Sequence, residues 1–401
     1  MVLVTRIISG SGAVTLMTLL ALRPPRPRRS SPFNLSFALT FLVNEQPFLG
    51  LYVLAAGAVP VLVGGDVGAP GWWVAVGVAA GTAAGLAVLA ARARTARPCL
   101  TAALRDALGP GAVPEREARG RRGRLPLLRL LFLPLVSYRF GVRRVADVRY
   151  GDAGRGHLLD VYVPRSGVTN APVLVYLHGG GFRVGGKMLG ARPLLYRLAG
   201  QGWVCVSANY RLGRGLRYAD RLADVRRVVR WVREHGADYG ADPGTLFLAG
   251  GSAGAHLAAT AALTANGTGT RPGPAADDTP VSGVIGLYGY YGRAEEHPGS
   301  SPLAHLRADA PPFLLVHGSM DTLVLPEDAR HFATELARVS TRPVVYAELP
   351  GTQHAFDFFP SIRFHAVIAA VEHFTTWVRS TENSPPQGEL SEGTGTVAGH
   401  D

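Results

Sequence analysis

The sequence predicts an α/β fold with a mostly parallel sheet, preceded by membrane helices. Between about residues 145 and 380, short apolar runs alternate with segments of helical periodicity, which is typical of a parallel sheet covered by helices on both faces. The first 98 residues instead contain long uncharged apolar runs. These two patterns place one globular unit behind a membrane region.

Composition divides the 401 residues into four parts. Residues 1–98 form the expected membrane region, and residues 99–144 form an arginine-rich linker with an expected interfacial or cap segment. Residues 145–380 have the composition of an ordinary globular domain. Residues 381–401 hold too few apolar side chains to repay their ordering entropy, so they are expected to be a disordered tail.

The clearest membrane candidate is residues 71–91, which carry no charge over about the length that crosses a bilayer. The pair Trp72 and Trp73 suits an interface at one end. A second uncharged run, Pro47–Gly65, precedes it across a short polar link, so the two spans should form a hairpin. With the shorter run Ile7–Leu22, two or three membrane helices are expected, although a soluble helical subdomain rich in Ala and Gly stays an alternative.

Arginines flank both ends of this hairpin. Under the positive-inside bias, they place both flanks, and with them the globular domain, in the cytoplasm of a multi-pass cell-membrane protein. The residues are Arg26, Arg28 and Arg29 before it and Arg92, Arg94 and Arg97 after it.

The net charge of +12 comes mainly from residues 92–149, which hold fourteen arginines against four acidic residues. Because this cluster directly follows an apolar segment, it favours topology and contact with anionic lipid over nucleic acid, for which no motif is present. Within the same region, residues 125–136 are apolar but too short to span. An interfacial segment, a flap over a cleft of the globular domain and a buried linker helix all fit them.

The globular part predicts seven strands and four helices. The strands are Leu158–Val163, Pro172–Leu177, Trp203–Ser207, Thr245–Ala249, Val281–Tyr288, Phe313–His317 and Val344–Ala347. The helices run from Asp220 to His235, from Ser252 to about Ala265, from Pro326 to Val339 and from about Ser361 to Ser380. Ligands of such a sheet are expected beyond the carboxyl ends of its strands.

Ser252 lies in Gly250-Gly251-Ser252-Ala253-Gly254, between an expected strand and an expected helix. A serine on such a sharp turn needs neighbours without bulk, which the glycines supply. Ser252 is therefore the candidate nucleophile.

A serine hydroxyl needs a base to take its proton and an acid to orient that base. Asp321 and His354 follow later strands, giving the order Ser, Asp, His along the chain. His256 is expected to pack, because it moves with the helix that Ser252 opens, and His317 is expected to be structural.

Backbone donors for an oxyanion are expected from Ala253, Gly179 and Gly180, the last two in His178-Gly179-Gly180-Gly181. Gly181, Gly186 and Lys187 also satisfy a phosphate-loop pattern, but Met188 stands where that loop needs a hydroxyl for Mg²⁺. Phe182 and Tyr288 are candidate pocket residues, with core packing an equal alternative for Tyr288.

Together these motifs resemble the alpha/beta hydrolase superfamily, in its esterase and lipase branch related to hormone-sensitive lipase and the feruloyl-esterase-like carboxylesterases. The resemblance covers about residues 145–380. It implies hydrolysis of carboxylic esters through an acyl-Ser252 intermediate, without cofactor or metal. Gly251 departs from relatives of hormone-sensitive lipase, which usually carry an acidic residue there.

The expected function is thus a membrane-anchored carboxylesterase acting on a small ester or lipid of short to medium acyl length, with membrane lipids as its other partners. Amide or formamide hydrolysis on the same residues is one alternative, and a noncatalytic lipid- or partner-binding module is another. The oligomeric state, the physiological substrate and the exact acyl length are not encoded in any pattern of the sequence.

Overall fold

The computed structural model describes residues 2–25, 35–65, 67–68, 70–118, 127–213, 215–265 and 280–382. Several sequence-based expectations fall outside these residues. They concern the tail beyond Glu382, three arginines before the first hairpin span, and the start of the 125–136 segment.

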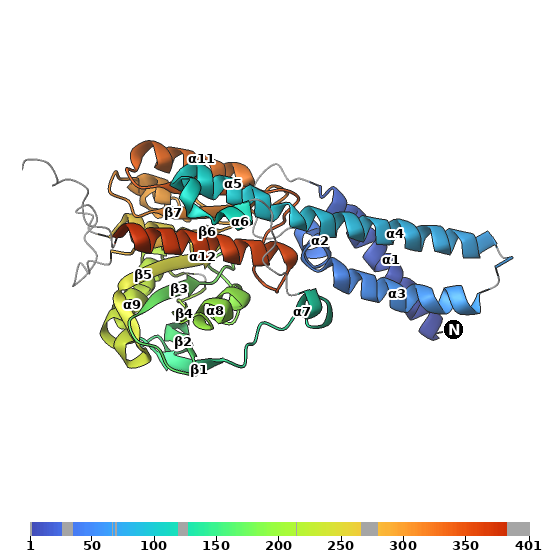
Figure 1. Ribbon diagram of the computed structural model, residues 1–401, viewed down its shortest axis with the longest axis horizontal. Coiled ribbons are helices and arrows are strands. Elements are labelled where there is room, and N and C mark those ends of the chain that lie inside the picture. Colours follow the sequence, from blue (N-terminus) through green and yellow to red (C-terminus); the bar gives the residue numbers. More distant parts are fainter. Residues whose placement is uncertain are drawn as a thin grey trace, which may run out of the picture.

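Four helices extend from one end of the sheet-containing body (Figure 1). They are α1 (Val2–Leu22), α2 (Leu35–Glu45), α3 (Pro47–Gly64) and α4 (Pro70–Arg94). Helices α3 and α4 lie side by side as the expected hairpin, with α1 packed on both. Their shared interior contains Leu54, Leu86 and Leu89.

Among the described residues, one helix, Gly71–Leu108, is long and apolar enough to cross a membrane. The pair Leu35–Glu45 and Pro47–Pro60, bent by 89°, would add a second span if it is counted as one. Length and composition alone do not distinguish such helices from the core of a soluble protein. The membrane assignment therefore stays a prediction.

The body contains an eight-stranded sheet in the order β1-β2-β4-β3-β5-β6-β7-β8. Strands β1 and β2 pair antiparallel, as do β2 and β4, and all other neighbours are parallel. This confirms the mostly parallel sheet. The strands are β1 (Val142–Arg149), β2 (Leu158–Pro164), β3 (Ala171–Leu177), β4 (Val204–Ala208), β5 (Ala241–Gly251), β6 (Gly283–Leu287), β7 (Phe313–Gly318) and β8 (Val344–Leu349).

Helices cover both faces of the sheet (Figure 1). Along β3, Val173 and Val175 face one apolar core and Leu174 and Tyr176 face the other, since successive strand side chains alternate. The first core includes α9 (Tyr218–His235), α10 (Ala253–Leu263) and α11 (Pro326–Val339). The second includes α5 (Ala96–Leu108), α8 (Arg192–Ala199) and α12 (Ile362–Glu382).

The described part of the arginine-rich linker contains regular secondary structure. Helix α5 packs against α12 and β8, and strand β1 begins at Val142, inside the range assigned to the linker. Two short helices, α6 (Glu115–Ala118) and α7 (Leu127–Phe132), lie between them. In α7, Leu130 is buried against Ala93 and Ile362, so this part of the 125–136 segment joins the bundle to the body.

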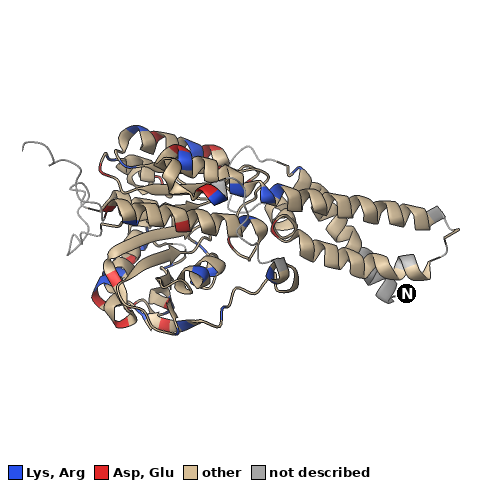
Figure 2. Ribbon diagram, viewed as in Figure 1, with Lys and Arg blue, Asp and Glu red and all other residues tan. Residues whose placement is uncertain are grey.

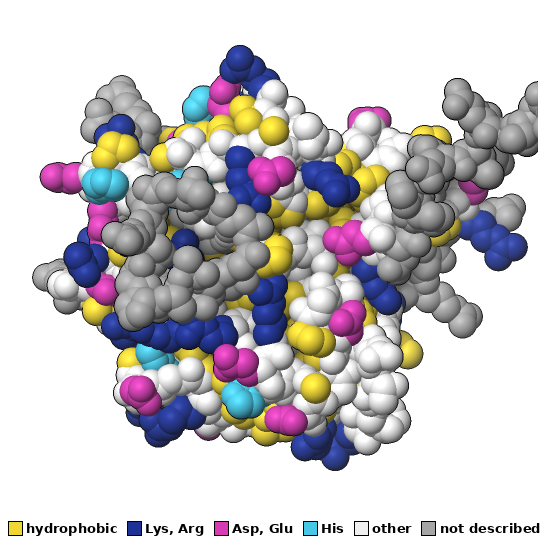
Figure 3. All heavy atoms as spheres, turned by 90° about the vertical axis from the view of Figure 1, so that its left-hand side faces the viewer, with side chains coloured by type: hydrophobic (Ala, Val, Ile, Leu, Met, Phe, Trp, Pro, Cys, Tyr) yellow, Lys and Arg dark blue, Asp and Glu magenta, His cyan; other side chains and the backbone are white. Residues whose placement is uncertain are grey.

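Charge is distributed very unevenly along the long axis. The body carries Lys, Arg, Asp and Glu over its helices, whereas the described part of the bundle is almost free of them (Figure 2). The end of the body turned away from the bundle has charged side chains of both signs across its surface (Figure 3). The bundle thus suits an apolar environment, whereas the opposite end of the body suits water.

Candidate active site

Ser252 stands on a strained turn between β5 and α10. Its backbone has φ +53° and ψ −118°, which a residue with a side chain rarely adopts. A Cβ at Gly250 would overlap the Gly254 backbone, and one at Gly254 would overlap the Leu177 carbonyl. The glycines are therefore required by close backbone packing, as expected for this turn.

Gly251 is required for a different reason. A Cβ at this position would overlap the Tyr288 hydroxyl and lie 2.9 Å from the Tyr176 hydroxyl. Both hydroxyls donate to the buried carboxylate of Asp357, Tyr176 at 2.6 Å. Burial raises the pKa of Asp357 above its ordinary value, and these two donors offset only part of that rise. An acidic side chain at residue 251 has no room, and the carboxylate near the turn belongs to Asp357.

Asp321 and His354 form a direct pair. His354 Nδ1 lies 2.6 Å from Asp321 Oδ2, and the other carboxylate oxygen accepts from the backbone N–H groups of Leu323 and Val324 at 2.8 and 2.9 Å. Burial alone would raise the pKa of Asp321, but His354 and His317 lower it well below its ordinary value. The carboxylate is therefore ionised and fixed in orientation.

Two further side chains support this pair. His317 Nε2 lies 3.3 Å from Asp321 Oδ2 and 3.0 Å from the Val324 carbonyl oxygen. Gln353 Oε1 accepts from the backbone N–H groups of His354 at 3.1 Å and Thr322 at 3.0 Å. His317 is therefore a structural residue, as expected, and it contacts the candidate acid, Asp321. Gln353 was not singled out, although it precedes the candidate base in sequence.

Tyr288 connects the acid and base to the serine turn. Its ring lies 4.5 Å from the His354 ring, centroid to centroid, while its hydroxyl occupies the space beside Gly251. Tyr288 is 1% exposed, which favours the packing alternative, and its place in a substrate pocket stays a prediction. Tyr288 thus joins His354 to Gly251, the residue before Ser252, at the carboxyl ends of the strands.

The glycine loop after β3 lies against the serine turn. A Cβ at Gly179 would be 3.1 Å from the Ser252 Cβ, and Gly180 has φ +124°. The Tyr210 hydroxyl donates to the His178 carbonyl at 2.8 Å, and His178 Nδ1 donates to the Gly179 carbonyl at 2.7 Å. Because C=O and N–H point in opposite directions across a trans peptide, these bonds fix the directions of the Gly179 and Gly180 N–H groups.

The third candidate donor is the N–H of Ala253, in the first turn of α10. The first N–H groups of a helix have no acceptor within the helix and carry its positive dipole end. Since Ala253 directly follows Ser252, its N–H lies beside the nucleophile by connectivity.

Phe182 and His256 lie together on the side of α10. Phe182 is half-buried, and its ring centroid is 5.6 Å from that of His256. His256 Nδ1 accepts from the Tyr218 hydroxyl at 3.1 Å, and Nε2 donates to the Gly292 carbonyl at 2.9 Å. Burial lowers the pKa of His256 to about 4. His256 is therefore a neutral packing residue, as expected, with both ring nitrogens occupied.

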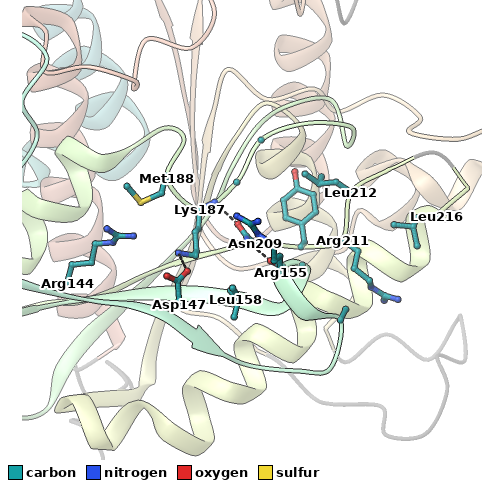
Figure 4. Close-up of a pocket in the computed structure, with 15 residues that line it drawn as sticks. Arg144, Asp147, Arg155, Leu158, Lys187, Met188, Asn209, Arg211, Leu212 and Leu216 are labelled. Atoms are coloured by element: carbon teal, nitrogen blue, oxygen red, sulfur yellow. Dashed lines mark hydrogen bonds and ion pairs between the residues drawn. The ribbon is translucent and has the colours of Figure 1, made fainter.

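The amine of Lys187 is already paired with carboxylates and is not free to bind a phosphate. Its Nζ lies 2.5 Å from Asp160 and 2.8 Å from Asp147, on the wall of an open pocket of about 680 Å³ (Figure 4). Asn209 accepts from the Lys187 backbone N–H at 2.6 Å in the same wall. The amine neutralises the buried carboxylate of Asp160 and also pairs with the exposed carboxylate of Asp147, which the phosphate-loop alternative does not explain.

Comparisons with known proteins agree with this architecture. The family model BD-FAE matches residues 159–294. The probable carboxylic ester hydrolase LipM of Mycobacterium tuberculosis is 38% identical over 77% of this chain and 78% of its own length, and esterase LipQ of the same organism is 34% identical over 75% and 79%. Thermogutta terrifontis esterase 2 phosphorylated by paraoxon has a TM-score of 0.51 at 26% identity, covering 59% of this chain and 93% of its own.

The fold and the arrangement at the strand ends define an alpha/beta hydrolase of the esterase class. The chain belongs to the family of carboxylic ester hydrolases that includes LipM and LipQ. It is therefore an enzyme that hydrolyses carboxylic esters.

Proposed function

We propose that this chain is a membrane-anchored serine carboxylesterase in which Ser252 is the nucleophile, His354 the general base and Asp321 the residue that orients it. The observation that carries the proposal is the 2.6 Å contact between His354 Nδ1 and Asp321 Oδ2, packed through Tyr288 against the strained Ser252 turn. With Nδ1 donating to the carboxylate, Nε2 is the nitrogen left to accept a proton.

In acylation, the Ser252 oxygen attacks the ester carbonyl carbon while its proton passes to His354 Nε2. The tetrahedral oxyanion is stabilised by the N–H groups of Gly179, Gly180 and Ala253, which are oriented before the reaction begins. As the C–O bond to the alcohol breaks, His354 returns the proton to the alcohol oxygen. The products are a free alcohol and an acyl-Ser252 ester.

Deacylation repeats these steps with water. His354 takes a proton from the water as its oxygen attacks the acyl carbon, the same donors hold the second oxyanion, and the proton then returns to Ser252. The negative charge of Asp321 stabilises the imidazolium that forms in both halves. The acid product and the free enzyme result, and no other group is required for atoms and electrons to balance.

Short to medium acyl chains are the proposed substrates. Ser252 is only 9% exposed, so little space surrounds the nucleophile. An enclosed nucleophile of this kind restricts the bulk that reaches it. A series of p-nitrophenyl esters from acetate to palmitate should give its highest kcat/KM at eight carbons or fewer.

The bundle supports the membrane part of the proposal. Apolar side chains cover its outside, where water would disfavour them, and charge is nearly absent from it (Figure 2). Arg92 and Arg94 end α4 at the body, and under the positive-inside bias they support a cytoplasmic location for it. The exposed side chains include Leu16, Leu19, Val53, Val59, Val63, Trp73, Val74, Val78 and Val88.

Two experiments test this function. Ser252→Ala should abolish hydrolysis of p-nitrophenyl butyrate while leaving the circular dichroism spectrum unchanged, and retained activity would exclude Ser252. For the membrane, the chain should remain with membranes through alkaline carbonate extraction, and protease should reach the body only from the cytoplasmic side of oriented vesicles. Release by carbonate would contradict the anchor.

A further inference from the structure

Helix α2 reaches from the bundle to the candidate base. The ring of Phe37 lies 5.9 Å from the ring of His354, centroid to centroid, with the planes at 86°. Phe37 is half-buried, whereas Tyr288 on the core side of the same imidazole is 1% exposed. The two aromatic rings thus contact His354 from the bundle and from the core.

Further along α2, Phe41 contacts the same loop as Phe37. It lies one helical turn from Phe37, so both rings share a face of the helix. Its centroid is 5.7 Å from that of Phe358 and 5.9 Å from that of Phe359, which belong to the loop that carries His354. The apolar face of α2 therefore follows this loop beyond the catalytic residue.

Polar contacts fix α2 to both sides of the loop. Gln353 donates to Thr40 Oγ1 at 3.3 Å, directly before His354. At the other end, Glu45 forms a buried ion pair with Arg363 and accepts from the Ser361 hydroxyl at 3.1 Å. A buried pair with a further hydrogen bond holds a specific geometry, because separating its charges in the interior is costly.

The chemistry assigns a role to this position. The leaving alcohol must lie within hydrogen-bond reach of His354 Nε2, which protonates its oxygen. The alcohol portion of the ester therefore occupies the space beside the imidazole, and the core side of that ring is already filled by Tyr288. The half-buried ring of Phe37 borders the other side of the His354 imidazole, where the alcohol group would lie.

We propose that Phe37 is a specificity-determining residue that limits the size of the alcohol group, and that the Glu45–Arg363 pair holds it in place. The inference rests on the proposed function, because it uses His354 as the base. It gives helix α2 a part in substrate selection as well as in anchoring the chain.

The test compares two substrate series on the full-length detergent-solubilised protein. Butyrate esters of methanol, butanol and cyclohexanol vary the alcohol, and p-nitrophenyl acetate, butyrate and octanoate vary the acyl chain. Phe37→Ala should raise the ratio of kcat/KM for the cyclohexyl over the methyl ester by about tenfold, as expected for added space in an apolar pocket. The ratios in the acyl series should stay within about twofold of wild type.

Leu42→Ala is the matched control, since Leu42 is exposed on the same helix. It should leave both series unchanged. An alcohol ratio in Phe37→Ala within twofold of wild type, the same shift in Leu42→Ala, or a shift in the acyl series instead would each overturn the proposal. Phe37→Leu supplies a smaller enlargement if the alanine variant fails to fold. Failure of the proposed function is distinguishable, because Ser252→Ala would then retain hydrolysis.

Discussion

The hydroxyl of Tyr288 occupies the space that a side chain at residue 251 would need. This contact explains why the residue before the candidate nucleophile is glycine, and it links three elements that are distant in sequence. The hydroxyl donates to Asp357 in the loop after His354, while the ring of Tyr288 packs on His354 itself.

Gly251→Ala should therefore impair both stability and hydrolysis. Its methyl group would displace the Tyr288 ring, whose Cζ lies 2.7 Å from the added carbon, and overpacking of this kind costs about 1–3 kcal/mol. Thermal unfolding and kcat with p-nitrophenyl butyrate measure the two effects. Gly141→Ala is the control, because its added carbon meets nothing within 4 Å, and equal effects of both variants would contradict this account.

Asp321→Asn should lower kcat by about 10³- to 10⁴-fold with little change in KM. The amide keeps the shape of the side chain but removes the charge that stabilises the imidazolium and selects its tautomer. Steady-state kinetics at pH 7.5 measure this change. A decrease smaller than tenfold would show that another acid orients His354.

Stability should fall between pH 6.5 and 4 because His256 is buried in its neutral form. Its pKa is about 4 in the folded state against an ordinary value of 6.5, so the unfolded chain binds more protons in this window and gains stability from them. Above pH 6.5 the contribution is constant, and over the whole window the loss approaches about 3 kcal/mol. Denaturant titrations at pH 7.5, 6.5, 5.5 and 4.5 measure it.

His256→Gln removes this titration, so the stability of the variant should depend less steeply on pH than that of the wild type. His178 has a pKa lowered to about 4 by burial and leaves a residual slope in the variant. Parallel curves for the two proteins would contradict the assignment of His256 as a neutral core residue.

Tyr210→Phe tests how the oxyanion donors are oriented. Losing the hydroxyl frees the His178 carbonyl, which it contacts at 2.8 Å, so the Gly179 N–H should lose its fixed direction. We expect kcat to fall about tenfold, less than for outright removal of a donor, with KM within about twofold. Tyr290→Phe is the control, since its hydroxyl donates to the Arg293 carbonyl, and an equal decrease there would refute the orienting role.

Local sequence patterns were sufficient for much of the fold and for bringing together the candidate pair of Asp321 and His354. Apolar runs and helical periodicity identified seven of the eight strands of the described sheet, because central strands buried on both faces are nearly continuous in Val, Leu and Ile. Strand β1 was missed because it is an edge strand that carries Arg143, Arg144 and Arg149. Helix α8 was missed because eight residues are too few to establish a period.

Long-range contacts were not predictable in the same way. Asp321 and His354 could be paired because both directly follow strands of a parallel sheet, whose carboxyl ends share one edge. Nothing local connects Phe37 to His354, or Tyr288 to Gly251, since each contact depends on how separate elements pack. For the same reason, the ring beside the base comes from α2 and not from the apolar segment at residues 125–136.

The most direct test of the central claim is to trap the acyl-enzyme. The full-length protein is mixed with p-nitrophenyl butyrate, quenched in acid within the first turnover, digested and analysed by mass spectrometry. This account predicts a butyryl group on the peptide that contains Ser252, and none in Ser252→Ala. Rapid hydrolysis by the wild type with the butyryl group on another residue, or with hydrolysis intact in Ser252→Ala, would contradict it.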